Sequence, residues 1–206
     1  MAGPRGSAEA TKLAILNAAR ELFAAHGVNA VTVRDVAAAA GVNHALVHRY
    51  FGTKEEMVAG IVDREIQAAI AVSPPEGSAT AESLEGIRRL VSFYMTEGQT
   101  TLQLIMQAEL AGVHPERLLH GKSRLIGMMA QWIAGEQAKL GADTSGLPDP
   151  ALVSAVVGAA IFSFVNMAPW LMTSVGLEPD DYEKRRGEII EILTGIVAQA
   201  AGVTRA

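Results

Sequence analysis

Residues 41–57 read GVNHALVHRYFGTKEEM, and this stretch decides the fold of the N-terminal part of the chain. Asn43 is a good helix N-cap, so the segment after it is expected to be a short helix ending near Phe51. At about 100° per residue, one side of this helix is polar and the other apolar. The polar side carries His44, Ala45, His48 and Arg49. The apolar side carries Leu46, Val47, Tyr50 and Phe51.

A second short helix is expected just before this one. The residues from Thr32 to Asp35 have the form of a capping box, and the alanine-rich run that follows ends at Gly41. Two short helices joined by a tight turn containing glycine, with a polar outer face on the second, are typical of a helix-turn-helix. The outward residues are then expected to enter the major groove, where Arg49 suits guanine and the histidines suit bases or phosphates.

Lys54 begins the next helix, in a second capping box that runs from Thr53 to Glu56. A cation in the first turn opposes the helix dipole at a cost of a few tenths of a kcal/mol, about the size of one weak surface pair. The cost is explained if that helix end faces an anion. We therefore expect Lys54 to bind a DNA phosphate beside the recognition helix.

Two other interpretations fit parts of this stretch. A two-faced helix is often an ordinary solvated surface helix, although the two capping boxes, the glycine turn and Lys54 together favour DNA contact. His44 and His48 also have the i, i+4 spacing of a metal-binding pair. No glutamate or third ligand accompanies them as in H-E-x-x-H, so we expect no metal and no cofactor.

Composition limits the class of protein. The 206 residues contain no cysteine, which excludes disulfides, thiolate metal sites and a cysteine nucleophile. The net charge of −5 is uneven: residues 1–57 hold six Lys/Arg against five Asp/Glu, and the rest hold eleven against seventeen. The N-terminal part is therefore at +1 and the remainder at −6, which permits local contact with a polyanion. No signal peptide and no uninterrupted apolar run of about 18 residues is evident, so a cytoplasmic protein without membrane contact is expected.

The pattern is helical almost throughout, and predicts an all-α protein of about nine helices. After a break at residues 73–80, further helices are expected at about 81–97, 100–112, 116–140, 149–174 and 180–201. We predict an N-terminal three-helix helix-turn-helix domain over residues 1–54. Residues 55–206 are predicted to form a helical domain for ligand binding and dimerisation.

The run ILNAARELFAAHGVNAVTVRDVAAAAGVNHALVHRYFGTKEEM, residues 15–57, resembles the DNA-binding domain of the tetracycline-repressor (TetR) family. The resemblance implies a homodimer, operator DNA as partner, and repression released by a small molecule. By motif position it implies DNA contacts at Thr32, Arg34, Asn43, His44, Ala45, His48, Arg49 and Lys54. The family usually has tyrosine where this chain has His48, so that contact could depend on pH. It usually has a small residue, often threonine, where this chain has Leu46.

The C-terminal part shows no catalytic constellation, and we expect no enzyme activity. Aromatic, methionine and glutamine side chains on the helices that form the family's ligand pocket are candidates for binding an apolar effector. They are Phe93, Tyr94, Met95, Gln103, Met106, Gln107, Met128, Met129, Gln131 and Trp132. The last two helices carry much apolar surface and are expected to pair with a second copy. The interface candidates are Val156, Ala160, Phe164, Ile189, Leu193 and Ile196.

Two other functions stay open at this point. One is a sequence-tolerant DNA-binding protein without an effector, although such proteins usually spread positive charge widely and the larger part of this chain is acidic. The other is an enzyme or carrier that uses the helical pocket, which the missing catalytic set disfavours. The leading hypothesis is a ligand-responsive repressor that binds a palindromic operator as a dimer.

Overall fold

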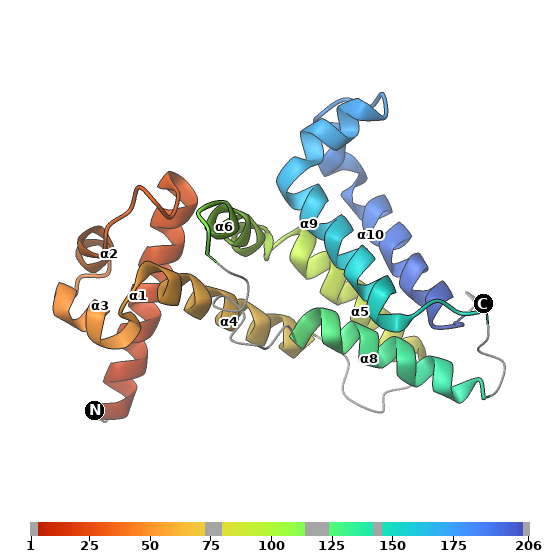
Figure 1. Ribbon diagram of the computed structural model, residues 1–206, viewed down its shortest axis with the longest axis horizontal. Coiled ribbons are helices and arrows are strands. Elements are labelled where there is room, and N and C mark those ends of the chain that lie inside the picture. The colour runs from red at the N-terminus through yellow and green to blue at the C-terminus, as the bar shows by residue number, and fades with distance from the viewer. Residues whose placement is uncertain (1–3, 73–79, 114–123, 142–145, 204–206) are drawn as a thin grey trace. The chain divides into compact units, whose positions relative to one another are not determined.

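A computed structural model describes residues 4–72, 80–113, 124–141 and 146–203, and these residues form nine helices and no strand. The prediction of an all-α protein is therefore confirmed (Figure 1). The helices are α1 (Pro4–His26), α2 (Val33–Ala39), α3 (His44–Phe51), α4 (Lys54–Val72), α5 (Thr80–Met95), α6 (Gln99–Leu110), α8 (Arg124–Lys139), α9 (Pro150–Ser174) and α10 (Asp181–Ala200). The part of the expected helix at 116–140 that precedes residue 124 lies outside the described residues.

The chain divides into two compact units. The first comprises Met1–Glu65 with Thr100–Lys122, and the second comprises Ile66–Gln99 with Ser123–Ala206. The division falls inside α4, and α6 belongs to the first unit together with α1, α2 and α3. The boundary predicted from the sequence, after residue 54, lies nearer the start of α4 than this division does. It remains a prediction of where the DNA-binding domain ends.

The first unit has a core of aliphatic and aromatic side chains at helical spacing. From α1, Ile15, Ala19 and Phe23 are fully buried, and Val36 of α2 and Val47 of α3 are buried at 0% and 1% exposure. The N-terminal half of α4 completes this core with Met57, Val58, Ile61 and Val62. Burial of these side chains holds α2 and α3 in a set arrangement with α1 and leaves their polar sides in solvent.

The second unit is a bundle of α5, α8, α9 and α10. Helix α9 packs against α8, α10 and α5, and α9 and α10 run side by side in opposite directions (Figure 1). Val157 and Ile161 of α9 and Leu193 and Val197 of α10 are buried in the bundle. An ion pair between Arg88 of α5 and Glu191 of α10 adds a polar link at the surface.

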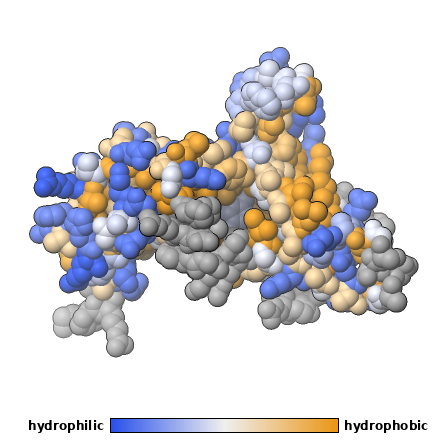
Figure 2. Space-filling view, viewed as in Figure 1, coloured by the Kyte–Doolittle hydropathy of each residue, from blue (hydrophilic) through white to orange (hydrophobic). Residues whose placement is uncertain are grey.

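Helix α9 is the most apolar of the described helices and is bent. By length and composition alone, this helix could span a membrane. Within the described residues, 22% of its most apolar stretch is buried. The backbone at Met167 leaves the helical conformation (φ −135°, ψ 19°), two residues before Pro169. Proline removes a backbone donor and clashes with the preceding turn, which explains the kink. In Figure 2 hydrophobic surface gathers over α9 and α10.

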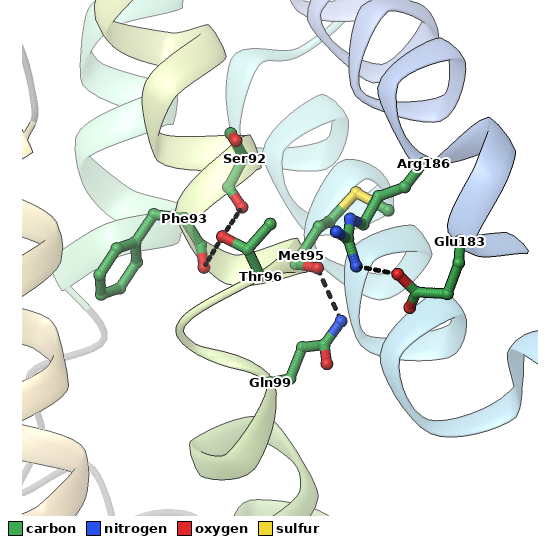
Figure 3. Close-up of polar contacts among 7 residues, drawn as sticks. All are labelled: Ser92, Phe93, Met95, Thr96, Gln99, Glu183 and Arg186. Carbon is green, nitrogen blue, oxygen red and sulfur yellow. Dashed lines mark hydrogen bonds and ion pairs between the residues drawn. The ribbon is translucent and has the colours of Figure 1, made fainter.

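The C-terminal end of α5 is closed by side chains of residues that follow it in the chain (Figure 3). Thr96 Oγ1 donates to the carbonyl oxygen of Ser92 at 2.8 Å, and Gln99 Nε2 donates to that of Met95 at 2.7 Å. These bonds satisfy carbonyl groups that the end of a helix would otherwise leave without partners. The Phe93 ring and the Met95 side chain project to different sides of the helix in Figure 3.

Candidate nucleic-acid interface

The interface begins at the start of α2, where Thr32 and Asp35 form the predicted capping box. Thr32 Oγ1 accepts from the backbone N–H of Asp35 at 3.2 Å, and the carboxylate of Asp35 accepts from the backbone N–H of Thr32 at 2.8 Å. The Thr32 hydroxyl also donates to that carboxylate, and these bonds hold the pKa of Asp35 below its ordinary value of 3.8. The box is confirmed, and it leaves Thr32 and Arg34 exposed at the first turn.

The turn between α2 and α3 needs a left-handed residue. Gly41 has φ +66°, a conformation that glycine adopts without steric cost. The backbone N–H of Val42 donates to the carbonyl of Ala37 at 3.0 Å, which closes the end of α2. Asn43 then accepts from the N–H of Ala45 through Oδ1 at 2.9 Å, so the predicted N-cap of α3 is confirmed.

Helix α3 presents a polar row above a buried apolar anchor. Val47 is 1% exposed and Leu46 is half-buried, while His44, Ala45, His48 and Arg49 are all exposed. The two-sided helix predicted from the sequence is therefore present in the structure. A side with two imidazoles and a guanidinium can donate hydrogen bonds to base edges and phosphates.

Arg49 is held in place by Tyr50, a contact that the helical wheel does not indicate. Its guanidinium lies 4.9 Å from the centre of the Tyr50 ring, and Nη2 donates to the Tyr50 hydroxyl at 2.9 Å. Lys12 of α1 lies 5.8 Å from the same ring centre. Tyr50 therefore orients the Arg49 guanidinium and lies near a second cation, Lys12, which also pairs with Glu9 at 3.0 Å. Lys12 lies 38 positions before Tyr50, so no local sequence pattern indicates that the two side chains are close.

His48 turns back toward the end of its own helix. Its Nδ1 lies 3.0 Å from the carbonyl oxygen of Gly52, the residue that ends α3 with φ +63°. The rings of His44 and His48 meet edge to face with their centres 6.4 Å apart. Among the residues that the structure describes, no group of three or more His, Asp or Glu side chains could hold a metal ion.

Lys54 is placed differently from the simple phosphate anchor expected from the sequence. Its ammonium donates to the carbonyl oxygens of Val28 at 2.9 Å and Asn29 at 3.2 Å, in the segment after α1. The capping box around it is confirmed, because Thr53 N donates to Glu56 Oε2 and Glu56 N donates to Thr53 Oγ1, both at 3.2 Å. An ammonium has three donors, so one is left for a phosphate.

The ligand-pocket candidates are divided between the two units. Gln103, Met106 and Gln107 lie on α6 of the first unit, and the other seven lie on α5 and α8 of the second. Met95 and Met129 are buried at 0% and 5% exposure, whereas Gln103 and Gln131 are exposed. Trp132 Nε1 is buried and has no hydrogen-bond partner among the described residues.

The interface candidates on α9 and α10 also differ in exposure. Ile189 and Leu193 are 8% and 4% exposed and belong to the core of their own chain. Val156 and Ile196 are 55% and 41% exposed, and Ala160 and Phe164 are half-buried. The large exposed apolar residues on these helices also include Leu152, Met167, Trp170 and Ile192.

Comparison with known proteins supports the same reading of the N-terminal unit. Residues 15–61 match the family model described as bacterial regulatory proteins, tetR family. The chain is 49% identical over 55 residues to the HTH-type transcriptional repressor Rv3405c of Mycobacterium tuberculosis, a match covering 27% of this chain and 29% of that protein. It is 33% identical over 87 residues to the HTH-type transcriptional repressor SCO4008 of Streptomyces coelicolor, covering 42% and 43%. Both matches thus span less than half of each relative.

Solved structures extend the likeness of fold to nearly the whole chain. The GusR structure from Salmonella enterica has a TM-score of 0.67 and 16% identity, with 98% of each chain covered. A putative TetR-family transcriptional regulator from Rhodococcus has a TM-score of 0.66 and 20% identity, covering 90% of this chain and 99% of that one. The helix-turn-helix of α2 and α3 lies within residues 15–61, so this part of the chain matches the tetR family of bacterial regulatory proteins, and the solved structures extend the likeness in fold alone.

Proposed function

We propose that this chain is a transcriptional repressor that binds operator DNA through α3. The observation that carries the proposal is the exposed row of His44, Ala45, His48 and Arg49, set on a helix whose other side is anchored by Val47. Residues at the start of a recognition helix contact base edges, which suits His44 and Ala45. Arg49, held by Tyr50, has a pre-oriented guanidinium for a guanine or a phosphate.

The remaining predicted contacts suit the sugar–phosphate backbone. Thr32 and Arg34 are exposed at the N-terminal end of α2, where the guanidinium of Arg34 can donate to a phosphate. Asn43 holds the first turn of α3, so its side chain acts by positioning that helix. Lys54 keeps one donor for a phosphate while two others bind carbonyl groups. Phosphate contacts of this kind fix the position of the protein on the duplex, and base contacts determine which DNA sequence is recognised.

The working form is a homodimer in the bacterial cytoplasm. Exposed apolar side chains on α9 and α10, with Val156, Trp170, Ile192 and Ile196 among them, form a surface that a monomer would leave in water. A second copy is the occupant proposed here, because a two-fold pair presents two copies of α3 to the two halves of a palindrome. Ile189 and Leu193 are left out of this interface because they are buried within one chain.

The effector is proposed to be a small, mostly apolar molecule that binds within the second unit near α8. The support is Trp132, whose buried Nε1–H has no partner among the described residues. A buried donor without a partner costs about 1–3 kcal/mol, so a ligand oxygen that accepts from it gains affinity. Met128 and Trp132 are one helical turn apart on α8, and a methionine beside the indole adapts to ligands of varied shape.

The test is selection of bound duplexes from a random pool with the full-length protein. We expect recovery of one palindromic sequence with half-sites about one helical turn apart, ~34–36 Å, or slightly more on bent DNA. Its affinity should exceed that of random duplexes by about a thousandfold or more at physiological salt. Equal affinity for selected and random duplexes would instead favour a sequence-tolerant DNA-binding protein, and no binding at low salt would remove DNA as the partner.

A further inference from the structure

His48 has a proton arrangement that its neighbour dictates. The partner of Nδ1 is the backbone carbonyl oxygen of Gly52, 3.0 Å away, and a carbonyl oxygen only accepts hydrogen bonds. Nδ1 must therefore carry the proton. In the neutral ring the other nitrogen, Nε2, is then a bare acceptor, and it becomes a donor only when the ring is doubly protonated.

The position of His48 on α3 indicates what this nitrogen meets. The helix runs from His44 to Phe51, so His48 lies in its second half, and its ring is drawn toward Gly52 at the C-terminal end. Residues at the N-terminal end of a recognition helix meet the base edges. On bound DNA, a ring drawn toward the other end would meet the sugar–phosphate backbone that borders the groove, where every available oxygen is an acceptor.

We propose that His48 binds a DNA phosphate as an imidazolium, so that each recognition helix takes up one proton from solvent when it binds DNA. This inference rests on the proposed DNA-binding function. The neutral ring offers a phosphate only a lone pair at Nε2, which repels it. Protonation supplies an N–H donor and a positive charge, while the bond from Nδ1 to Gly52 is kept. DNA binding, and with it repression, therefore strengthens as pH falls.

The charged groups on the elements around α3 leave the proton uptake to His48. On α2, Asp35 is engaged by Thr32. On α1, Lys12 lies over Tyr50, which also binds Arg49. Each of these three charged groups is thus engaged by a neighbour other than His48.

Two further groups lie close to His48 or to its partner. On α4, the carboxylate of Glu56 accepts from the N–H of Thr53, next to Gly52. On α3 itself, the ring of His44 lies edge to face with His48. His44 is the second imidazole of α3, so it requires its own control variant.

The sign of the effect separates a phosphate contact from a base contact. For a phosphate, the bound state holds one more proton per helix than the free state, so affinity rises by up to tenfold per pH unit for each helix as pH falls. Once the free protein is itself protonated, the dependence flattens. If Nε2 instead accepted from the amino group of adenine or cytosine, protonation would destroy the contact and affinity would fall with falling pH.

The experiment measures affinity for the selected operator duplex by fluorescence anisotropy from pH 8 to pH 6 at constant ionic strength. The full-length protein is compared with His48→Tyr, whose hydroxyl donates without titrating near neutrality. His44→Gln keeps His48 and removes the second imidazole of the helix. His26→Gln, at the exposed end of α1 and outside the interface, controls for general histidine effects. Far-ultraviolet circular dichroism at each pH checks that all four proteins stay helical.

We expect the unsubstituted protein, His44→Gln and His26→Gln to bind more tightly as pH falls, and His48→Tyr to bind with a flat profile. At pH 6 the salt dependence of the unsubstituted protein should be steeper than that of His48→Tyr by about 0.9 per helix, one extra phosphate contact. Calorimetry in two buffers of different ionisation enthalpy counts the protons taken up without any variant, and one per helix is expected.

Three results would overturn the inference while leaving the DNA-binding function intact. They are specific binding that is flat with pH, binding that weakens as pH falls, and a pH dependence that persists in His48→Tyr but is lost in His44→Gln. Absence of specific binding at every pH would instead overturn the proposed function itself, so the two failures are distinguishable.

Discussion

Lys54 Nζ lies 2.9 Å from the carbonyl oxygen of Val28, and the same ammonium reaches the carbonyl of Asn29 at 3.2 Å. The first residue of α4 is thereby tied to the segment after α1, 26 positions earlier in the chain. A side chain expected only to bind DNA therefore also connects two parts of the first unit. Removal of the side chain should therefore affect stability as well as any contact with DNA.

Lys54→Ala should lower both stability and DNA affinity. Loss of hydrogen bonds from a charged donor costs about 1.5–3 kcal/mol of unfolding free energy when the site is protected, and the half-exposed position of Lys54 places it at the low end. The salt dependence of DNA binding should also fall by about 0.9 per site if the third donor meets a phosphate. Denaturant unfolding and salt titration of the same variant measure the two effects separately.

The matched control is Arg34→Ala. Arg34 is exposed on α2, and its replacement should weaken DNA binding without changing the unfolding midpoint. If Lys54→Ala left the salt dependence unchanged while lowering stability, Lys54 would be a structural residue and not a phosphate contact.

Arg49→Ala should relax sequence preference at particular bases and cost about 1–3 kcal/mol of specific binding. Tyr50→Phe is the companion variant, because it removes the hydroxyl that accepts from Arg49 but keeps the ring under the guanidinium. It should therefore lose less affinity than Arg49→Ala. The measurement is competition between the operator and duplexes with single base-pair changes. If Arg49→Ala lost the same affinity for every duplex, Arg49 would contact a phosphate and not a base.

Asp35 makes the start of α2 sensitive to acid. Its pKa lies below 3.8 because the Thr32 hydroxyl and backbone N–H donate to the carboxylate. The unfolded state therefore binds a proton more readily, and the stabilisation is present above pH 3.8 and lost as pH falls through the folded-state pKa. Asp35→Asn should melt at a lower temperature than the unsubstituted protein at pH 7, and the difference should close below pH 3.8.

Thr32→Ser, which keeps the hydroxyl, is the control for this acid effect. Its melting temperature should follow that of the unsubstituted protein across the whole pH range. A difference between Asp35→Asn and the unsubstituted protein that stayed constant with pH would mean that the carboxylate charge contributes nothing.

The helix-turn-helix could be predicted from the sequence because its signals are local. Thr32 with Asp35, Asn43 before α3, and Thr53 with Glu56 each lie within three residues of the group they bind. The partners of Lys54 and of Tyr50 lie on other parts of the chain, and no spacing rule reaches them. Contacts of that kind follow from packing and become visible only in the folded unit.

The buried side of α10 could not be predicted for a different reason. The apolar residues in the second half of this helix cover a wide arc of about 160°, with Ile192 and Ile196 at one edge and Ile190 and Val197 at the other. The hydrophobic pattern therefore marks an apolar face but does not indicate which part of it enters the core. Packing against α5 and α9 selects Ile189, Leu193 and Val197 and leaves Ile192 and Ile196 exposed.

This division yields a test of the dimer. Ile192→Asp and Ile196→Asp should produce a folded monomer, because each places a carboxylate on surface that a second copy would cover. Ile189→Asp should instead lower the unfolding free energy by several kcal/mol, because it buries an unpaired charge inside the chain. Sedimentation equilibrium reports the dimer and circular dichroism reports the fold. If the double variant with Ile192→Asp and Ile196→Asp remained a dimer of unchanged affinity, this surface would not be the dimer interface.

The effector prediction is tested through Trp132. The chain has two tryptophans, and the other, Trp170, is 64% exposed, so Trp170→Phe leaves the half-buried Trp132 as the sole tryptophan fluorophore. An apolar ligand that accepts from Nε1 should change the emission of Trp132, and a panel of small apolar molecules can be screened by this signal. Molecules that change this emission in the absence of DNA are the ones to carry forward.

Each such molecule is then titrated with and without operator DNA. A ligand shifts an equilibrium only by its differential affinity for the two states, so loosening DNA a hundredfold needs about 2.7 kcal/mol of coupling. Reciprocity requires that operator DNA weaken the ligand by the same hundredfold. Trp132→Phe, which keeps an aromatic ring and removes the N–H, should weaken ligand binding by about tenfold for a lost hydrogen bond of about 1.4 kcal/mol. Equal ligand affinities in both titrations would identify a bound molecule that is not the effector, because a molecule without differential affinity cannot release DNA.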